Sequence, residues 1–318
     1  MKRLPGLKKV HDVHASESPE VVAIVDEMGR SGGFMAKNLH DVAKVLEEMN
    51  RRPNCTKFLS FPADIMATGA RGLLIDMVKE GMVDVIVTTC GTLDHDISRT
   101  EADYFEGDFD LDDVFLRRNG YHRLGNVLVP LESYGPLIER RMQAILGKLY
   151  RSGTRSVTSE ALAREIGRDL DSHRSLLYWA QKKGVPVFVP GLTDGAVGSQ
   201  VWLFAESHRD FHIDPIGDER RLSDITSEAK ETGALVLGGG ISKHHLIWWN
   251  LFRGGLDYAC YITTAAEFDG SLSGARVREA ISWGKVKEKA KHATLYSEVT
   301  LALPFLVSYL LTKKKAAT

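Results

Sequence analysis

Residues 235–285, LVLGGGISKHHLIWWNLFRGGLDYACYITTAAEFDGSLSGARVREAISWGK, decide the fold. An apolar run ends in glycines at 238–240, a helical pattern follows through 245–252, and a second apolar run occupies 257–263. Apolar runs separated by a helix are typical of a βαβ unit, whose parallel strands are buried on both faces. Three consecutive glycines let backbone amides approach a phosphate or ribose closely, although a tight strand-to-helix turn is an equally simple interpretation.

The same alternation extends through the rest of the chain. Further apolar or β-branched runs occur at 57–61, 83–89 and 185–190, and helical patterns occur at 68–80 and 176–183. This pattern predicts an α/β fold with a parallel sheet that carries helices on both faces. Ligands of such sheets bind at the carboxyl ends of the strands, so the polar, Gly-rich loops after the runs form the predicted site: 88–92, 190–199, 238–245 and 263–274.

The composition is that of an ordinary globular protein. Hydrophobic residues make up 43% and charged residues 26% of the 318 residues, and the formal net charge is −1. Without a global positive field, neither nucleic acid nor a membrane is an expected partner. The cysteines are sparse and form no CxxC pair, which suits a reducing compartment. The basic N-terminus lacks an apolar core, and the run 301–311 contains Pro304 and is too short for a bilayer, so we expect a soluble cytoplasmic protein.

No Pro- or Ser-rich linker and no internal repeat divides the chain. We therefore expect one domain, 1–318, in which residues 1–50 form a helical N-terminal arm. Residues 100–125 change from acidic to basic, and we expect them to form a surface excursion.

Lys285 is the candidate nucleophile. Its neighbours Trp283 and Val286 are apolar, and a lysine shielded from water favours the neutral amine that attacks carbonyl or imine carbon. Taken alone, a Trp-Gly-Lys tripeptide more often places a surface lysine in a turn. Trp283 can attract a cation over its ring, and Glu279 can bind an ammonium group. Lys243 is the other lysine of this stretch, but it begins a helix and has no apolar flank.

His244 and His245 lie at the start of the helical pattern after the glycines. Adjacent helix residues face different ways, so we expect no shared metal ion, and no HExxH or paired CxxC motif predicts a metal site elsewhere. Either histidine is a candidate acid or base near neutral pH, or else a capping or surface residue. Trp248 and Trp249 fit the core better than a ligand wall.

Asp194 and Asp269 each precede a glycine in a loop that follows a predicted strand. Such carboxylates can accept hydrogen bonds from ribose hydroxyls, and they also form Asx turns with their own backbone. From the residues alone, both interpretations stay open.

Three longer motifs resemble those of a known family. GGGxxKHH at 238–245, DYAxYIxTAxEFDGSxSGAR at 257–276 and EAxSWGK at 279–285 are the most specific, and MVDVIVTT, LTDG and GNVLVP support them. Together they resemble deoxyhypusine synthase over nearly the whole chain, from about Gly32 to residue 311. The resemblance implies a Rossmann-like, doubly wound and mostly parallel sheet, and a homotetramer with active sites between subunits.

The resemblance also implies a reaction. Members of the family oxidise spermidine with NAD, release 1,3-diaminopropane and pass the four-carbon unit as an imine to an enzyme lysine. The unit then moves to one lysine of the translation initiation factor 5A precursor, where the imine is reduced. Lys285 falls on the nucleophilic lysine, His244 on the active-site histidine, and the polyamine-binding positions are Glu279, Trp283 and Gly270. The NAD contacts carry over to Thr89, Gly91, Asp194, Gly239, Thr264, Ala265 and Asp269.

Several positions depart from the family pattern. TTAGGVEED reads TTCGTLDHD here, so Asp94 and His95 replace two glutamates. Ser199 and Leu272 stand where aspartates usually bind an amine, and Trp248 stands where an asparagine is common. A polyamine in a dry site needs carboxylates, so we expect altered donor binding or a less cationic donor. The candidate substitute acids are Asp94, Asp96 and Glu101.

The leading hypothesis is NAD-dependent aminobutyl transfer from spermidine to the factor 5A precursor. A homospermidine synthase-like transfer to a small amine is the alternative enzyme, and a cofactor-binding scaffold without activity is the alternative class. Lys285, His244 and Glu279 are all retained, which favours an enzyme.

Overall fold

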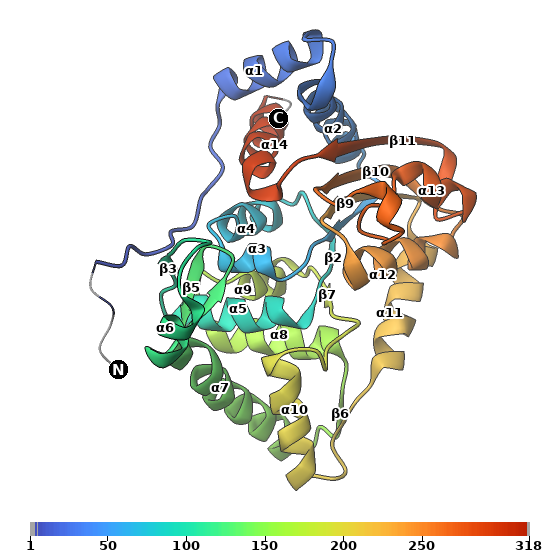
Figure 1. Cartoon of the computed structure of the whole chain (residues 1–318). Helices are drawn as coiled ribbons and strands as arrows, with labels where there is room; N and C mark the ends of the chain where they lie inside the picture. Colours follow the sequence, from blue (N-terminus) through green and yellow to red (C-terminus); the bar gives the residue numbers. More distant parts are fainter. Residues whose placement is uncertain (1–3, 5, 317–318) are drawn as a thin grey trace.

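Six strands pair in parallel in the order β11–β10–β9–β1–β2–β7 (Figure 1). The computed structural model describes residue 4 and residues 6–316. The strands are β1 (Cys55–Ser60), β2 (Val85–Val87), β7 (Val187–Phe188), β9 (Glu231–Leu237), β10 (Leu256–Thr263) and β11 (Val286–Tyr296). The predicted parallel sheet is confirmed, but the edge strand β11 was not predicted, because its residues alternate between charged and small side chains.

Side chains of β9 show how the sheet divides two cores. Ala234 and Val236 pack against one face together with Leu222, Leu246 and Val277. These last three residues belong to α11 (Pro215–Glu228), α12 (Gly240–Leu251) and α13 (Val277–Ser282). Alternate residues of a strand point to opposite faces, and Leu235 and Leu237 accordingly belong to the other core.

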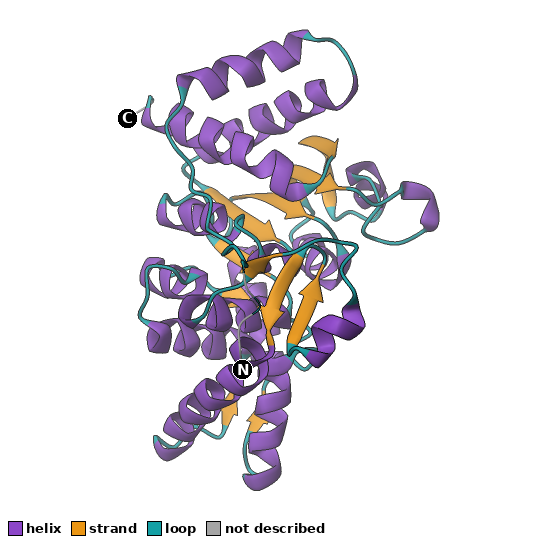
Figure 2. Cartoon of the chain, turned by 60° about the vertical axis from the view of Figure 1, so that its left-hand side comes forward, coloured by secondary structure: helices purple, strands orange, loops and turns teal. Residues whose placement is uncertain are grey.

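The second face is covered by a larger set of helices, and helices lie on both sides of the strands in Figure 2. The helices that contribute to this core include α2 (Phe34–Arg51), α4 (Arg71–Lys79), α5 (Cys90–Glu101), α7 (Leu131–Arg151), α8 (Ser159–Leu170), α9 (Leu176–Lys183), α10 (Ala196–Ser207) and α14 (Val299–Lys315). The doubly wound, Rossmann-like α/β fold is therefore confirmed. Among the described residues, no helix is both long and apolar enough to cross a membrane.

The N-terminal helices pack beside the C-terminal one. α1 (Pro19–Arg30) contacts both α2 and α14 at the top of Figure 1. Ser18 begins α1 by accepting a hydrogen bond from the amide of Val21 at 3.2 Å, and proline at the first helical position has no amide to satisfy. Residues 8–15, here called the N-terminal strap, run in extended conformation along the outside of α4. The division of the chain into one domain stays a prediction.

The stretch expected to be a surface excursion folds into a small layer of its own. β3 (Phe105–Glu106), β5 (Val127–Pro130) and β4 (Tyr121–Leu124) form an antiparallel sheet, beside which lies α6 (Asp113–Arg118). Its buried residues Phe105, Leu116, Tyr121 and Leu128 pack against Leu7. The remaining elements are α3 (Asp64–Ala67), the short parallel pair β6 (Ser156–Val157) and β8 (His212–Ile213), and the 3₁₀ turn η1 (Glu267–Asp269).

Candidate active site

The loops predicted to bind ligand all follow strands of the parallel sheet. They leave the carboxyl ends of β2, β7, β9 and β10, which lie along one edge because the strands run in the same direction. Three cavities lie near these loops: one between α12 and α13, one at the carboxyl edge itself, and one beyond β7 that is lined by Pro190, Thr193 and His245.

The first cavity, here called the lysine pocket, has a volume of about 260 Å³. It is enclosed by α12, α13, β10 and the loop that joins β10 to α13. Its lining residues include four that the sequence singled out: Lys285, His244, Glu279 and Trp283. The structure therefore brings the predicted nucleophile, histidine and polyamine contacts together.

Lys285 lies between two indole rings. Its side-chain amine is 5.6 Å from the ring centroid of Trp248 and 5.1 Å from that of Trp283. Only 7% of the residue is exposed, and its Nζ has no hydrogen-bond acceptor among the described residues. The amine is thus shielded from water and makes no hydrogen bond that would hold back its attack on a substrate. The expectation that Trp248 lies in the core is wrong, because it is 39% exposed and forms a wall of this pocket, whereas Trp249 packs against the core.

Lys243 is deeply buried, although it has no apolar flank in the sequence. It is 1% exposed and donates hydrogen bonds to the carbonyl oxygens of Leu272 at 2.7 Å and Ala275 at 2.8 Å. Its amine also lies 4.3 Å from the ring centroid of Tyr261. Burial lowers the pKa of Lys243 to about 8. Lys243 lines the pocket, but the two carbonyls fix its amine in place, so this amine holds the loop instead of being free to react.

The adjacent histidines face different cavities, as expected for neighbouring helix residues. His244 lines the lysine pocket and stacks on Trp248 with ring centroids 5.7 Å apart. Burial, with Lys285 nearby, lowers the pKa of His244, so its imidazole is neutral near pH 7 and can accept a proton. His245 lies near Glu219, with Nε2 and Oε2 3.6 Å apart, and burial lowers its pKa to about 4.

The charge of the lysine pocket is unusual for a polyamine site. Glu279 is the one carboxylate among its lining residues, which also include the cations Lys243, Arg276 and Lys285. Leu272 lines the pocket, so an apolar side chain does occupy that position. Ser199 does not line it and donates instead to the carbonyl of Gly195 at 2.9 Å. Within one chain, the pocket offers a single anionic partner to an amine.

The second cavity, here called the edge pocket, has a volume of about 250 Å³. It lies at the carboxyl ends of β1, β9, β10 and β11, and Gly238 and Thr264 are among its lining residues. Asp64 and Glu298 also line it, and sequence reasoning missed both. Asp64 follows the predicted run 57–61, so the expectation that ligands bind in loops after strands could have indicated it. Glu298 follows β11, the strand that was not predicted.

Other predicted cofactor contacts surround the edge pocket without lining it. Thr89 accepts a hydrogen bond from the amide of Ala63 at 3.1 Å. A Cβ on Gly91 would lie 2.8 Å from the Cβ of Ala63. Both residues therefore pack against Ala63, which lies between the lining residues Pro62 and Asp64. A Cβ on Gly239 would lie 2.4 Å from Ser273, so only glycine allows the loop to pack on this turn.

Four more candidates line neither the lysine pocket nor the edge pocket. Asp269 accepts from the amide of Ser271 at 2.7 Å and forms an Asx turn, and Gly270 follows it in left-handed conformation at φ +78°. Ala265 lines neither cavity, and Asp194 is exposed beyond β7. The two pockets have no lining residue in common. In the described part of the chain, no three His, Cys, Asp or Glu residues are placed to hold a metal ion.

The proposed substitute acids have structural roles instead. Asp94 is fully buried, caps α10 by accepting from the amides of Ala196 and Val197, and accepts from the hydroxyl of Tyr134 at 2.7 Å. Asp96 caps α9 in the same manner. Glu101 forms an ion pair with Arg141. None of these carboxylates lines the lysine pocket, so they do not replace the missing aspartates within this chain.

Comparisons with known proteins agree with the motifs. The family model described as deoxyhypusine synthase matches residues 23–310. A probable deoxyhypusine synthase from Thermoplasma acidophilum is 50% identical over 95% of this chain and 96% of its own, and one from Ignicoccus hospitalis is 46% identical over 97% of each. The crystal structure of a putative deoxyhypusine synthase from Entamoeba histolytica has the same fold, with a TM-score of 0.68 over 90% of this chain and 91% of that one at 23% identity.

Proposed function

We propose, since the chain belongs to the deoxyhypusine synthase family, that this transferase moves the aminobutyl group of spermidine to a lysine of the translation initiation factor 5A precursor, with NAD as its cofactor. The observation that carries the proposal is the position of Lys285, whose free amine lies between Trp248 and Trp283 in a pocket that also contains His244 and Glu279. A scaffold without activity would not need this arrangement.

The residues of the lysine pocket suit each step of a transfer. Lys285 Nζ forms a bond to the imine carbon of the oxidised donor, the bond from that carbon to the leaving nitrogen breaks, and 1,3-diaminopropane departs with the proton. His244, neutral near pH 7, takes the proton from the attacking amine and returns it to the leaving nitrogen. Glu279 binds the free ammonium end of the four-carbon unit, and the acceptor lysine then displaces Lys285 by the same exchange.

NAD supplies the oxidation of the donor and the later reduction of the product imine, so the overall transfer is redox neutral. The edge pocket suits the cofactor, because ribose hydroxyls need acceptors at the carboxyl ends of the strands. Asp64 has no partner among the described residues, and Glu298 lies across the same cavity. Gly238, at φ +72°, leaves the turn after β9 free of a side chain there.

A second copy of the chain should complete the site. Trp283, Phe252 and Trp248 are 64%, 65% and 39% exposed around the lysine pocket, and exposed aromatic clusters are typical of interfaces. The lysine and edge pockets are also separate within one chain. A homotetramer with sites between subunits, as the family resemblance implies, would close the lysine pocket and bring partner groups to it.

One incubation tests the reaction and the acceptor together. The enzyme receives NAD, spermidine labelled in its butyl carbons, and either the factor 5A precursor or putrescine, and mass spectrometry follows the label. We expect label on a single lysine of the precursor and release of unlabelled 1,3-diaminopropane. Label that enters only homospermidine would instead favour the small-amine transferase, and spermidine that stays intact in every mixture would refute the proposed transfer.

A further inference from the structure

One wall of the edge pocket is a short segment that cannot hold its own shape. Pro62, Asp64, Ile65 and Thr68 line the pocket, and α3 within this segment has only four residues. A single helical turn is unstable by itself, so its position must come from outside contacts. At its start, the hydroxyl of Thr88 donates to the carbonyl of Phe61 at 2.7 Å.

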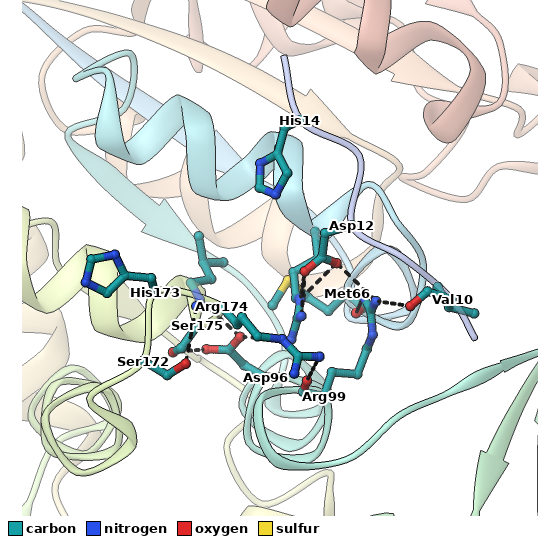
Figure 3. A network of polar contacts seen from close by, with 12 residues as sticks. Val10, Asp12, His14, Met66, Asp96, Arg99, Ser172, His173, Arg174 and Ser175 are labelled. Carbon is teal, nitrogen blue, oxygen red and sulfur yellow. Dashed lines mark hydrogen bonds and ion pairs between the residues drawn. The ribbon is translucent and has the colours of Figure 1, made fainter. Parts of the chain in front are cut away.

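The far end of the wall is held by Arg99 of α5. Its Nη1 donates to the carbonyl oxygens of Met66 at 3.0 Å and Thr68 at 2.5 Å, and the residue is 2% exposed. One guanidinium thus fixes the end of α3 and the turn after it, as Figure 3 shows for Met66. Arg99 itself does not line the edge pocket.

Arg99 is in turn held by the N-terminal strap. Asp12 forms an ion pair with Arg99, with Oδ1 and Nη2 3.0 Å apart (Figure 3). It also accepts a hydrogen bond from Arg71 Nη2 at 2.6 Å. Both guanidiniums are buried, and Asp96, 3.9 Å from Arg71, is the other carboxylate beside them. Removing the charge of Asp12 would leave two buried cations facing one anion, an arrangement that is costly in a dry interior. Although burial raises the pKa of Asp12, the hydrogen bond and charge of Arg71 hold it below its usual value.

The backbone of the strap also touches the wall directly. The amide of Val13 donates to the carbonyl of Gly69 at 2.8 Å, immediately after the lining residue Thr68. A Cβ on Gly69 would lie 2.5 Å from the carbonyl oxygen of His11, so the strap lies directly on this turn. No residue of the strap lines the pocket.

From these contacts we infer that the N-terminal strap is a working part of the cofactor site: Asp12 and Arg99 are positioning residues that keep the 62–68 wall in the shape that binds the nucleotide. The inference rests on the proposed function, because it takes NAD as the occupant of the edge pocket. It also predicts that the strap and the ligand stabilise each other: the strap strengthens NAD binding, and bound NAD makes the strap harder to detach.

The first test compares two anchors of the same strap. Asp12→Asn removes the charge that faces the wall, whereas Asp76→Asn removes the charge that accepts from the amide of Ala15 at 2.8 Å further along α4. Calorimetry with NAD should show binding weakened about tenfold in Asp12→Asn, the effect of one lost charge-assisted hydrogen bond. Asp76→Asn should change the dissociation constant less than threefold, and Asp12→Glu should restore part of the affinity.

The second test needs no variant. Hydrogen exchange at the amides of Val10 and Val13, which donate to Tyr104 and Gly69, should slow when NAD saturates the wild-type protein. A purely structural strap would exchange at the same rate with and without NAD. If Asp12→Asn does not fold, Arg99→Lys, which keeps the charge but cannot reach two carbonyls and a carboxylate at once, provides the binding measurement.

The outcomes separate the two claims. Wild-type protein that fails to bind NAD at millimolar concentration would refute the cofactor proposal. Wild-type protein that binds NAD without slower exchange in the strap, or a folded Asp12→Asn with unchanged affinity, would overturn the inference while leaving that proposal intact.

Discussion

At the scale of single residues, tertiary contacts rather than sequence neighbours distinguish the two lysines of the lysine pocket. Lys243 has no apolar flank in the sequence, yet two carbonyl oxygens and the Tyr261 ring enclose its amine. Lys285 has the apolar flank, and its amine is left without a hydrogen-bond acceptor in the described part of the chain. The residue with the free amine is the better nucleophile.

Lys285 should therefore carry the covalent intermediate. Treatment with NAD, spermidine and borohydride should fix an aminobutyl adduct on the peptide that contains Lys285. Lys285→Arg should abolish adduct and transfer, because a guanidinium stays protonated. Lys243→Met is the matched control, which should still form the adduct on Lys285 even if turnover is slower. An adduct on Lys243 in the wild-type protein would reverse the assignment.

Donor selectivity should depend on the apolar wall of the pocket. Because Glu279 is the single carboxylate lining it within one chain, spermidine has one direct ionic partner there, and its Michaelis constant should be weak. Leu272→Asp should lower that constant about tenfold, the effect of one additional partly buried ion pair. Leu272→Asn, equal in size but uncharged, should not. Tight and selective use of spermidine by the unmodified chain would mean that a partner subunit supplies the missing acids.

Two histidines, His95 buried and His245 largely shielded from water, should make the fold sensitive to acid. Burial, aided by Arg99, lowers the pKa of His95 to about 4, and burial, aided by His244, lowers that of His245 to about 4. The unfolded chain takes up these protons near pH 6.5, so the stabilisation is complete above that pH and is lost as the pH falls toward 4. At pH 5, each histidine should lower the free energy of unfolding by on the order of 2 kcal/mol relative to its value at neutral pH.

Urea unfolding at pH 7 and pH 5 measures this loss. In His95→Gln, the difference between the two free energies of unfolding should shrink by about the contribution of one histidine. An unchanged difference would mean that His95 is protonated in the folded state.

At the scale of elements, α5 organises the regions around the sheet. Its Asp94 caps α10, its Asp96 caps α9, and its Arg99 holds the end of α3. These residues lie on one helix, and each satisfies backbone groups of a different neighbour. The sequence suggested substrate-binding acids at Asp94 and Asp96, because the helices that they cap lie far away in the sequence and give no local signal of a structural role.

Removal of a buried helix cap on α5 should lower the free energy of unfolding more than removal of an exposed cap. Asp96→Asn breaks a buried charge that accepts from the Ser175 hydroxyl and two amides, and the free energy of unfolding should fall by about 3 kcal/mol. Asp112→Asn, at the exposed start of α6, is the control and should cost less than about 1 kcal/mol. Equal losses in denaturant unfolding would contradict the burial argument.

The elements show how far sequence reasoning extends. Strands such as β10 were predicted because both faces are buried and the run is continuously apolar. β11 was missed because it lies at the edge of the sheet, where only one partner strand requires its pairing and charged residues are tolerated. The motif 279–285 located the lysine pocket, and the loop after the run 57–61 could have indicated Asp64. Glu298 was missed because it follows the strand β11, which was not predicted. The strap contacts join segments distant in sequence, which periodicity cannot bring together.

At the scale of the whole molecule, the aromatic surface around the lysine pocket should join subunits. Light scattering at micromolar concentration should report a mass well above the 35.3 kDa of one chain. Phe252→Lys, beside the pocket, should lower that mass, because a charge in an apolar interface is costly. Phe109→Lys is the control, since Phe109 is equally exposed at 65% but lies beside the small antiparallel sheet. An active wild-type monomer would exclude shared sites.

The order of the central sheet has a consequence for how the protein is made. β1 ends at Ser60, but one of its two neighbours, β9, begins only at Glu231. During translation, at about 5–20 residues per second, the unpaired backbone edge of β1 must wait roughly 10–30 s for that partner to emerge. Nascent chains that stop before Glu231 should therefore be sensitive to protease and dependent on chaperones, whereas chains that extend past β10 should become resistant. The central strands thus make folding a late event on the ribosome, whatever the speed of the steps that follow.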